Sequence, residues 1–424
     1  MKLGLFLLAA GHHAGGWRHP DAESGTENID LIVRCTQAAE RARFDMVFIG
    51  DRLVTQRDAH PSMITRPDPM AVLSALSMVT SRIGLAGTAS TTYSEPFNLA
   101  RTLATLDLLS RGRAAWNIVT TFADGSINFS RGRHPDHDLR YEIAEEFVSV
   151  VKGLWHSWDA DPYVRDKAAG IYVDVAKMHE LNHHGRFYQV AGPLNVTRSP
   201  QGQPVLIQAG SSGPGQALAA RHAEVVFTAQ QELGAAQAFY RGLKQQLAAQ
   251  GRRPGDCVVM PGLMPIVGRT PKEARDKLAL LQSFTDQSNA LAILSEHLEF
   301  DVSVFPLDGP LPELPPAPHA HSRRDLLLRS AHENHLTLRE LYHQVASARG
   351  HQIVAGTATE IADHMVRWVD AGAADGFNIM PAWFPGGLDD FTREVVPLLQ
   401  ERGRFRTEYE HATLRGNLGL PDPA

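Results

Sequence analysis

An α/β fold with a parallel sheet is predicted by three features of this 424-residue sequence. Apolar runs of strand length alternate with segments of helical periodicity along nearly the whole chain. The strand runs are apolar on both faces, which is typical of parallel strands that helices cover on each side. Eight such units occur, and no G-x-G-x-x-G sequence follows the first strand. These features favour a TIM-like (β/α)8 barrel over an open dinucleotide-binding sheet.

The predicted elements follow one another in strand–helix order. The predicted strands are Lys2–Ala9, Phe44–Gly50, Ile83–Ser90, Arg113–Thr120, Pro204–Ala209, Val225–Ala229, Val258–Val267 and Phe377–Ala382. The helical segments are Asn28–Ala42, Pro69–Thr80, Glu95–Ser110, Tyr141–Ser157, Leu233–Gln250, Pro271–Leu281 and Ile361–Ala371. The first strand run also resembles a short signal peptide, because one lysine precedes an apolar run that ends in small residues. The residues after it, Gly11–Pro20, are unlike a cleavage region, so we expect a strand.

Two segments, about 159–200 and 283–345, do not fit a minimal barrel. The first is polar and irregular, and the second contains a proline-rich run followed by a basic, histidine-rich helical stretch. Long excursions inside a compact domain are usually lids or binding loops. Because they leave strand 4 and strand 7 units, we expect both insertions over the C-terminal face of the barrel. The sequence predicts one domain over residues 1–424, with a polar tail from about 403 to 424 that packs on a partner subunit or extends freely.

The amino-acid composition limits which kinds of partner and which cellular compartment we expect. The chain is 43% hydrophobic and 21% charged, and its net charge of −6 gives no electrostatic case for nucleic acid or an anionic membrane. No apolar run approaches the roughly 20 residues of a membrane span. The two cysteines, Cys35 and Cys257, each lie inside an apolar element, which favours a reducing compartment. We therefore expect a cytoplasmic protein without a nucleic-acid or membrane partner.

The segment Pro204–Gln230 predicts a buried strand, a turn of small residues, a short helix and a second buried strand. The turn contains Gly210, Ser211 and Ser212, and Pro214 suits the first turn of the helix that follows. A helix start exposes unpaired backbone N–H groups at the positive end of the helix dipole. Two serine hydroxyls add donors, so this turn is a candidate phosphate site. The alternative is a helix cap with no ligand.

Chemistry in a barrel takes place at the C-terminal ends of the strands. Residues at these predicted ends are His12, Asp51, Ser90, Thr91, Asn117, Gln208 and Gln230. The set is polar but mostly uncharged, and it lacks the paired carboxylates of a glycosidase, a metal-ligand cluster and a G-x-S-x-G motif. We expect no metal site, because the adjacent His12 and His13 diverge. Amides, hydroxyls and one carboxylate suit a large heterocyclic cofactor that carries the chemistry.

Each of these residues also has a purely structural interpretation. Asp51 could cap the next helix, Ser90 and Thr91 could be turn residues, and Asn117 could satisfy buried backbone. A sharper pattern lies further along, because a helix that begins at Asp136 or Asp138 places His137 and Tyr141 one turn apart on one face. Both side chains could then reach one ligand; the alternative is a surface histidine beside a half-buried tyrosine.

The sequence resembles the NtaA/SnaA/DszA branch of the bacterial-luciferase-like flavin monooxygenases. The matching segments are GHHAGGWRHPDA, FDMVFIGD, STTYSEPFNLARTLATLDLLSRGRAAWNIVT, HDLRYEIAEEFVSVVKGLWHSW, HHGRFYQVAGPLNVTRSPQGQPVLIQAGSSGPG, RHAEVVFTAQ and AGAADGFNIMPAWFPGGLDDF. They occur in the family's order over nearly the whole chain. One departure is mild: Gly213 and Pro214 stand where the branch often has Glu or Ala.

The resemblance implies an FMN-binding barrel supplied with reduced FMN by a separate NAD(P)H:flavin reductase. Reduced FMN would react with O2 to give a flavin hydroperoxide that oxygenates a small organic substrate. Matching motif positions imply a flavin site of Asp51, Thr91, Asn117, His137, Tyr141, Ser211 and Ser212, to which the strand-end and turn arguments add Ser90 and Gly210. The expected catalytic residues are His137, Tyr141 and His12.

The substrate is less defined, because the branch oxidises aminopolycarboxylates, sulfones and sulfides, alkanes, N-acylated cysteines and antibiotic precursors. Basic residues of the second insertion are Arg323, Arg324, Arg329, His332 and His335. They favour an anionic substrate, unless they form only a solvated face. The resemblance implies that this substrate contains sulfur or nitrogen. The alternatives in function are an F420-dependent oxidoreductase of the same fold, a non-catalytic flavin-binding protein and a cofactor-free hydrolase. We expect a homodimer or a homotetramer.

Overall fold

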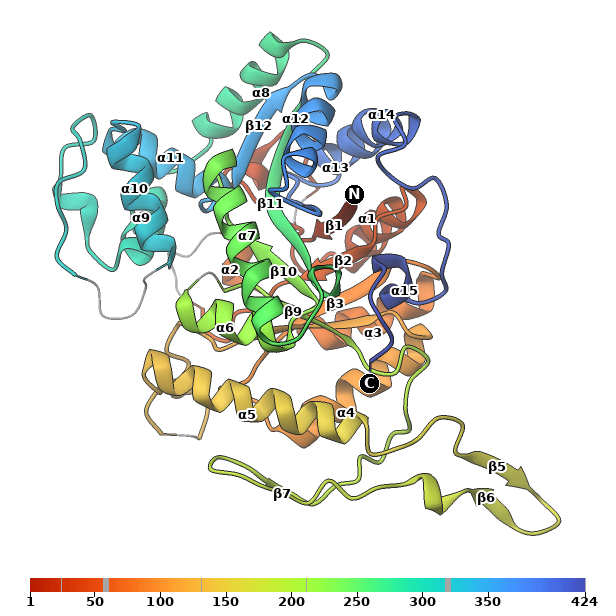
Figure 1. Cartoon of the computed structure of the whole chain (residues 1–424). Coiled ribbons are helices and arrows are strands. Elements are labelled where there is room, and N and C mark those ends of the chain that lie inside the picture. The colour runs from red at the N-terminus through yellow and green to blue at the C-terminus, as the bar shows by residue number, and fades with distance from the viewer. Residues whose placement is uncertain (24, 56–60, 131, 211, 317–321, 424) are drawn as a thin grey trace.

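The structure, a computed structural model, describes residues 1–23, 25–55, 61–130, 132–210, 212–316 and 322–423. Within these residues, eight parallel strands close into a barrel in the order β1-β2-β3-β4-β9-β10-β11-β13, with β13 paired to β1 (Figure 1). The barrel strands are β1 (Lys2–Phe6), β2 (Met46–Ile49), β3 (Gly84–Ser90), β4 (Ala114–Val119), β9 (Val205–Gln208), β10 (Val225–Thr228), β11 (Val258–Val267) and β13 (Gly376–Ile379). The predicted (β/α)8 barrel is confirmed.

The eight predicted strands all form, seven of them with a shift at one or both ends. The N-terminal run forms β1, a central strand of the barrel, as expected. One strand was not predicted: β12 (Gln352–Gly356) pairs with the second half of β11, at Leu263–Val267. It is a short run that begins with a buried glutamine and lies outside the closed barrel order.

Helices cover the outside of the barrel. They are α1 (Ile29–Arg41), α2 (Pro61–Ile64), α3 (Pro69–Val79), α4 (Pro96–Ser110), α5 (His137–Trp155), α6 (Gly213–His222), α7 (Leu233–Ala249), α8 (Pro271–Ser283), α12 (Ala358–Asp370), α13 (Gly386–Asp390) and α14 (Val396–Glu401), the last two joined by a π-helical turn, Phe391–Val395. Side-chain caps fix several helix starts: the Asn28 side chain accepts from the Leu31 N–H, and Thr357 and Glu360 form a capping box. None of the helices in the described ranges is long and apolar enough to cross a membrane.

The C-terminal tail closes the floor of the barrel, contrary to both outcomes expected from its polarity. Its helix α15 (Leu414–Leu418) places Leu414, Leu418 and Leu420 against inward-facing strand residues such as Val205 and Val258. Arg415 is 2% exposed and forms a bidentate ion pair with Glu224. The tail therefore packs on its own barrel, because its few leucines fill the interior at the N-terminal ends of the strands.

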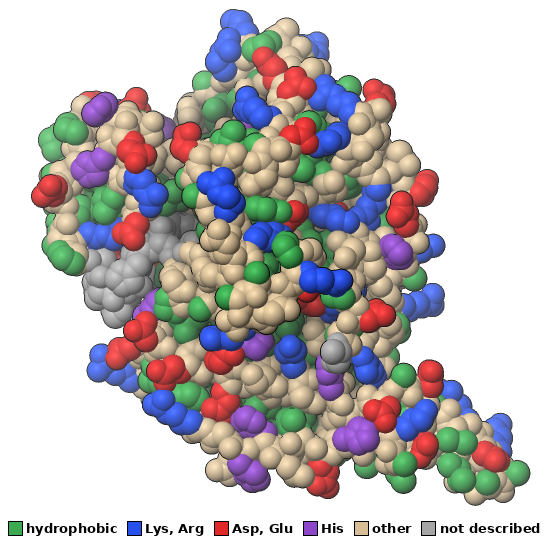
Figure 2. All heavy atoms as spheres, viewed as in Figure 1, with side chains coloured by type: hydrophobic (Ala, Val, Ile, Leu, Met, Phe, Trp, Pro, Cys, Tyr) green, Lys and Arg blue, Asp and Glu red, His purple; other side chains and the backbone are tan. Residues whose placement is uncertain are grey.

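The first insertion contributes no residue to the lining of the large cavity at the C-terminal ends of the strands and packs against the outside of α5, so it does not cover the C-terminal face as expected. It follows α5, which begins at the mouth and runs back along the outside, so the chain leaves α5 at the opposite end. It forms two hairpins, β5 (Tyr163–Asp166) with β6 (Ile171–Val173) and β7 (His183–His184) with β8 (Gln189–Val190). The β5–β6 hairpin projects from the body of the molecule as an arm (Figure 1), and Figure 2 shows hydrophobic side chains on its surface.

The second insertion lies at the C-terminal ends of the strands, as expected. It contains α9 (Gln287–Leu298), α10 (Ser322–Glu333) and α11 (Leu338–Ala348). These helices share an apolar cluster of their own, which includes Leu294, Leu327, Leu341 and Val345. The insertion is therefore a small packed unit and can hold side chains rigidly over the barrel.

Candidate functional site

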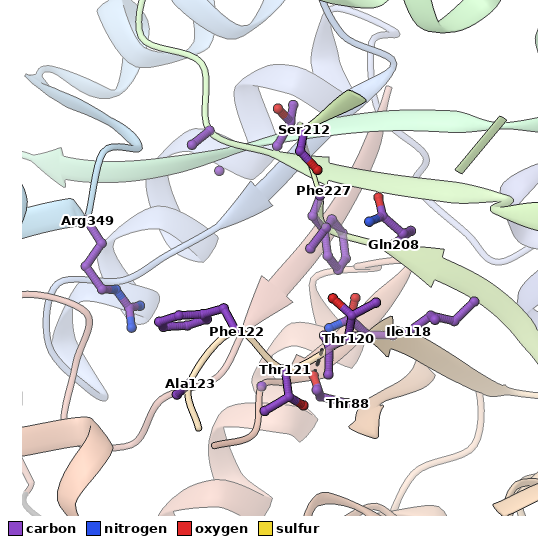
Figure 3. A pocket seen from close by; sticks show the side chains of 18 of the residues that line it. Thr88, Ile118, Thr120, Thr121, Phe122, Ala123, Gln208, Ser212, Phe227 and Arg349 are labelled. Carbon is purple, nitrogen blue, oxygen red and sulfur yellow. Dashed lines mark hydrogen bonds between the residues drawn. The ribbon is translucent and has the colours of Figure 1, made fainter. Parts of the chain in front are cut away.

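A cavity of about 1050 Å3 lies at the C-terminal ends of the barrel strands (Figure 3). Every barrel strand contributes to its lining, together with the starts of α5 and α6 and the second insertion. Sites for small molecules and cofactors commonly measure about 300–1,000 Å3. The cavity therefore has room for a cofactor and a small substrate together.

Most of the site residues predicted from the sequence meet at this cavity. Those that line it are Asp51, Ser90, Asn117, His137, Tyr141, Gly210 and Ser212. Thr91 and His12 are buried but do not line it. Ser211 lies outside the described residues.

The turn between β9 and α6 has the predicted geometry. Ser212 is the N-cap of α6, and its Oγ accepts a hydrogen bond of 3.2 Å from the backbone N–H of Gly215. The same Oγ lies 3.4 Å from the hydroxyl of Tyr141. A Cβ on Gly210 would come within 2.3 Å of Gln208 Nε2, so a larger residue here would require the Gln208 side chain to move. The turn presents a hydroxyl and a helix start to the cavity.

The start of α5 brings His137 and Tyr141 together, as the spacing predicts. The helix begins at His137, with Asp136 as its N-cap. The two rings are 5.1 Å apart, and both line the cavity. The His137 Nδ1 lies 2.8 Å from Asp138 Oδ1, which identifies Nδ1 as the protonated nitrogen, because a carboxylate can only accept.

Arg140, on the same helix, was not predicted. It lines the cavity and is 2% exposed. Its Nη1 donates to the carbonyl of Pro135 (3.0 Å) and to His134 Nε2 (2.9 Å), whereas its Nε has no partner. No carboxylate among the described residues forms an ion pair with it. A buried guanidinium without a counter-ion is costly, so this wall of the cavity is suited to an anion.

Three amide side chains within barrel strands line the cavity, namely Asn117 from β4, Gln208 from β9 and Asn378 from β13, and Gln230, just after β10, is a fourth lining amide. Asn117 donates from Nδ2 to Thr88 Oγ1 at 2.9 Å. The carbonyl oxygens of the three strand amides are buried without a hydrogen-bond partner. Buried polar atoms are normally paired, so these atoms mark where a polar ligand would complete the structure. Asn378 was missed, although an asparagine within the apolar strand β13 is the signal that could have found it.

Asp51 follows β2 and carries the carboxylate expected at the mouth. Burial raises the pKa of Asp51, and a hydrogen bond from the Arg52 N–H (2.8 Å) and the nearby Arg66 guanidinium oppose that rise. Arg66 also lines the cavity, and burial lowers its pKa to about 10. Asp51 and Arg66 therefore form a partly compensated charge pair at the wall.

Ser90 and Thr91 make the hydrogen bonds of a turn. Ser90 Oγ accepts from the backbone N–H groups of Thr92 (3.1 Å) and Tyr93 (3.2 Å), and from the hydroxyl of Thr121 (2.6 Å). Thr91 donates to the carbonyl of Val119 and does not line the cavity. Ser90 thus shapes the wall, and Thr91 supports the end of β4 from behind.

His12 is buried and does not line the cavity, and its expected catalytic role stays a prediction. Gly11 turns the chain at a φ of 86°, and a Cβ at that position would lie 2.2 Å from the carbonyl oxygen of Ala382. This turn brings His12 Nε2 to 2.8 Å from the carbonyl of Phe6 and His12 Nδ1 to 2.8 Å from Arg349 Nη2. Arg349 does line the cavity. The strand-end argument missed the turn at Gly11, and no sequence signal pointed to Arg349.

The second insertion supplies the outer wall of the cavity. Its lining residues include Glu296 and His297 from α9 and Asp325 and Arg329 from α10. Glu296 is held by an ion pair of 2.8 Å with Arg52 from the barrel. Of the basic residues noted in the sequence, Arg324 instead binds the backbone carbonyls of Leu298 and Pro315, and His332 and His335 do not line the cavity.

Among the residues that the structure describes, no group of three or more His, Cys, Asp or Glu side chains is arranged to hold a metal ion. The adjacent His12 and His13 diverge as expected. His13 Nδ1 accepts from the Gly15 N–H at 3.0 Å, and His13 Nε2 lies 2.9 Å from the Ser347 hydroxyl. Burial lowers the pKa of His13 to about 3, so this imidazole is a neutral structural group.

Comparisons with known proteins agree with this geometry. The chain is 51% identical over its whole length to N-acetyl-S-(2-succino)cysteine monooxygenase of Bacillus subtilis (strain 168), of which the match covers 97%. It is 44% identical, again over its whole length, to nitrilotriacetate monooxygenase component A of Aminobacter aminovorans, with 97% of that protein covered. A crystal structure of riboflavin lyase (RcaE) with modified FMN and riboflavin superimposes with a TM-score of 0.89 at 31% identity, covering 100% of this chain and 96% of the other. A family model described as luciferase-like monooxygenase matches residues 1–375. The chain therefore belongs to the luciferase-like monooxygenase family, in the branch that its sequence segments resemble.

Proposed function

We propose that this monooxygenase is the oxygenase component of a two-component system. It takes reduced FMN from a separate NAD(P)H:flavin reductase and uses O2 to oxygenate a small organic substrate. The observation that carries the proposal is one cavity that contains the Ser212 turn at the start of α6, the buried Arg140 guanidinium and three amides with unpaired carbonyl oxygens. One wall suits a phosphate and the other suits the polar edge of a heterocycle.

The residues present fit FMN in each of its parts. Ser212, the start of α6 and the Arg140 guanidinium would hold the phosphate, because charge-assisted hydrogen bonds and the helix dipole favour an anion there. The amides of Asn117, Gln208 and Asn378 would meet the donors and acceptors of the flavin ring. When bound, reduced FMN supplies the two electrons that let O2 deliver one oxygen atom to the substrate and release the other as water.

The side chains of the cavity would bind and orient the flavin and the substrate and would enclose the reacting atoms. The second insertion forms part of the cavity wall and would reduce the access of water to the reacting atoms. His137 Nδ1 donates to Asp138, which orients the imidazole ring, and the Tyr141 hydroxyl can donate. These two groups would donate a proton or a hydrogen bond to the reacting oxygen beside the flavin.

Two observations support a separate reductase, namely the lack of a dinucleotide-binding fingerprint after the first strand and the name of one relative. No dinucleotide-binding fingerprint follows the first strand, and the relative from Aminobacter aminovorans is named as a component A. The names of the relatives from Bacillus subtilis and Aminobacter aminovorans each describe a substrate with several carboxylates, built on sulfur or on nitrogen. We propose a substrate of that chemistry here.

The test measures NADH oxidation by the purified protein with FMN, O2 and N-acetyl-S-(2-succino)cysteine as the probe substrate. We expect no NADH oxidation by the protein alone, and both NADH oxidation and oxygenated probe once a flavin reductase is added. Efficient NADH use without the reductase would contradict the two-component assignment. Activity with reduced F420 but not with reduced FMN would favour the oxidoreductase alternative, and FMN binding without O2-dependent product would favour a non-catalytic flavin protein.

A homodimer or homotetramer is the assembly that we propose. The β5–β6 arm supports it, because an isolated two-stranded hairpin is marginally stable in water. The arm nevertheless exposes apolar side chains, among them Tyr172 (66% exposed), and Val175, two residues after the end of β6, is 67% exposed. A second copy of the chain would cover this surface.

A further inference from the structure

Helix α10 turns two different faces to the rest of the molecule. Leu327 and Ala331 are buried and belong to the apolar cluster that the second insertion shares among α9, α10 and α11 (Figure 1). Asp325 and Arg329 lie one turn apart on another face, where both are exposed and line the cavity. The apolar face therefore fixes the helix, and the polar face presents a carboxylate and a guanidinium at the outer wall of the cavity.

The side chains of Asp325 and Arg329 are both available to a ligand. Among the residues that the structure describes, neither of these side chains forms a hydrogen bond or an ion pair. Another acid of this wall, Glu296, differs because Arg52 already pairs with it at 2.8 Å. An exposed ion pair at the spacing of Asp325 and Arg329 would stabilise a helix only weakly, and by less than a hydrogen bond between a charged side chain and a charged ligand does. A ligand can therefore occupy both side chains at little cost.

Arg329 and Asp325 favour different chemical groups. A guanidinium only donates, and its planar set of N–H groups matches the two oxygens of a carboxylate. A carboxylate such as that of Asp325 only accepts, so it requires an N–H or O–H donor. Because the two residues are neighbours on one helix face, a ligand with a carboxylate and an N–H group on the same carbon atom can bind both. That combination is the α-amino-acid group, either free or N-acylated.

We infer that Arg329 is a specificity-determining residue that binds a carboxylate of the substrate, and that Asp325 accepts a hydrogen bond from the nitrogen on the same carbon atom. The inference rests on the proposed function, since this α-amino-acid group belongs to the molecule that is oxygenated beside the flavin. The group itself does not react. Its capture at the outer wall orients the rest of the substrate and so lowers the cost of bringing the reacting atom to the flavin. Ile293 and Leu326 of the same insertion also line the cavity and suit the apolar part of such a substrate.

Three thioethers serve as matched probes. The complete probe is N-acetyl-S-(2-succino)cysteine, which contains an N-acylated α-amino-acid group. The addition product of N-acetylcysteamine and maleate lacks only the carboxylate of that group, and the addition product of 3-mercaptopropionate and maleate lacks only its acetylamino substituent. Each probe is titrated by calorimetry into protein saturated with oxidised FMN, so that no turnover takes place without a reductant.

We expect the wild type to bind the complete probe about tenfold more tightly than the probe without the carboxylate. Arg329→Gln should lose that preference, and Arg329→Lys should keep part of it, because lysine retains the charge but not the planar fork. Asp325→Ala should instead lose the preference for the complete probe over the one without the acetylamino group. Arg241→Gln, the same change on an exposed arginine of α7, is the control and should bind all three probes as the wild type does.

FMN binding and Tm are measured for every variant and should match the wild type, since both side chains are exposed and no contact in the described structure is lost. The inference is overturned if the FMN-loaded wild type has no preference for the complete probe, or if Arg329→Gln keeps it. It is also overturned if Arg329→Gln weakens FMN binding, because the guanidinium would then belong to the cofactor site. Retention of the acetylamino preference by Asp325→Ala would remove Asp325 from the assignment. Failure of the wild type to bind FMN would instead overturn the proposed function.

Discussion

Replacing Ser212 with alanine separates the helix-cap role of this residue from its proposed role at the cofactor. Loss of the cap on Gly215 N–H should cost about 1 kcal/mol of folding free energy. An unfolding entropy of about 2.1 cal/mol/K per residue gives roughly 0.9 kcal/mol/K for this chain, so Tm should fall by only about 1 °C. Loss of one charge-assisted hydrogen bond to the phosphate should cost about 1.5–3 kcal/mol, which weakens FMN binding about 10- to 100-fold.

Riboflavin is the matched ligand for this experiment, because it lacks the phosphate. Equilibrium dialysis should show Ser212→Ala binding riboflavin as the wild type does, while it binds FMN less tightly. Ser212→Gly, which costs the helix only a few tenths of a kcal/mol, should lose the same FMN affinity with almost no change in Tm. Ser212→Thr keeps a hydroxyl and should retain most of that affinity. The reasoning is refuted if Ser212→Ala discriminates FMN from riboflavin as the wild type does.

Three further predictions concern the reaction with O2, the packing of the C-terminal tail and the pH dependence of stability. His137→Ala and Tyr141→Phe should each raise the H2O2 formed per NADH consumed while leaving Tm unchanged; full coupling in the double variant removes both residues from the site. Arg415→Met leaves the Glu224 carboxylate buried without its ion-pair partner, so the free energy of unfolding in urea should fall by about 3–5 kcal/mol. Adding Glu224→Gln should recover part of this loss. An unchanged urea midpoint in Arg415→Met would mean that the tail does not close the floor of the barrel. In the unfolded chain, His13 takes up a proton below its ordinary pKa of 6.5, whereas the folded imidazole does so only near pH 3. The free energy of unfolding should therefore fall by about 1.4 kcal/mol per pH unit as the pH drops between those two values. His13→Asn should flatten that dependence, and a wild-type slope in the variant would contradict it.

The sequence predicted the barrel because its strands are apolar on both faces and are separated by helices, and β11 (Val258–Val267) was predicted with its observed ends. It predicted the Ser212 turn and the His137–Tyr141 pair because short-range spacing determines both. It missed β12 because pairing of that strand depends on a partner far away in the chain. The floor of the barrel was also missed, since the few leucines of a polar tail indicate burial only once the barrel is closed.

The errors in the site have similar causes. His12 follows a strand and so was placed at the mouth, but the turn at Gly11 directs its side chain back to Phe6 and Arg349. The first insertion was expected at the mouth because it follows strand 4 in the sequence, whereas α5 first returns the chain to the other end. In both cases the direction of the chain after an element, which the residue pattern does not encode, determined the outcome.

The central claim, that this cavity holds reduced FMN by its phosphate, is tested most directly by an anaerobic titration of the wild type with reduced FMN, reduced riboflavin and reduced F420. The account predicts saturable binding of reduced FMN at one site per chain, at least about tenfold tighter than reduced riboflavin because of the phosphate contacts. Equal affinity for reduced FMN and reduced riboflavin, or binding of reduced F420 in preference to reduced FMN, would contradict it.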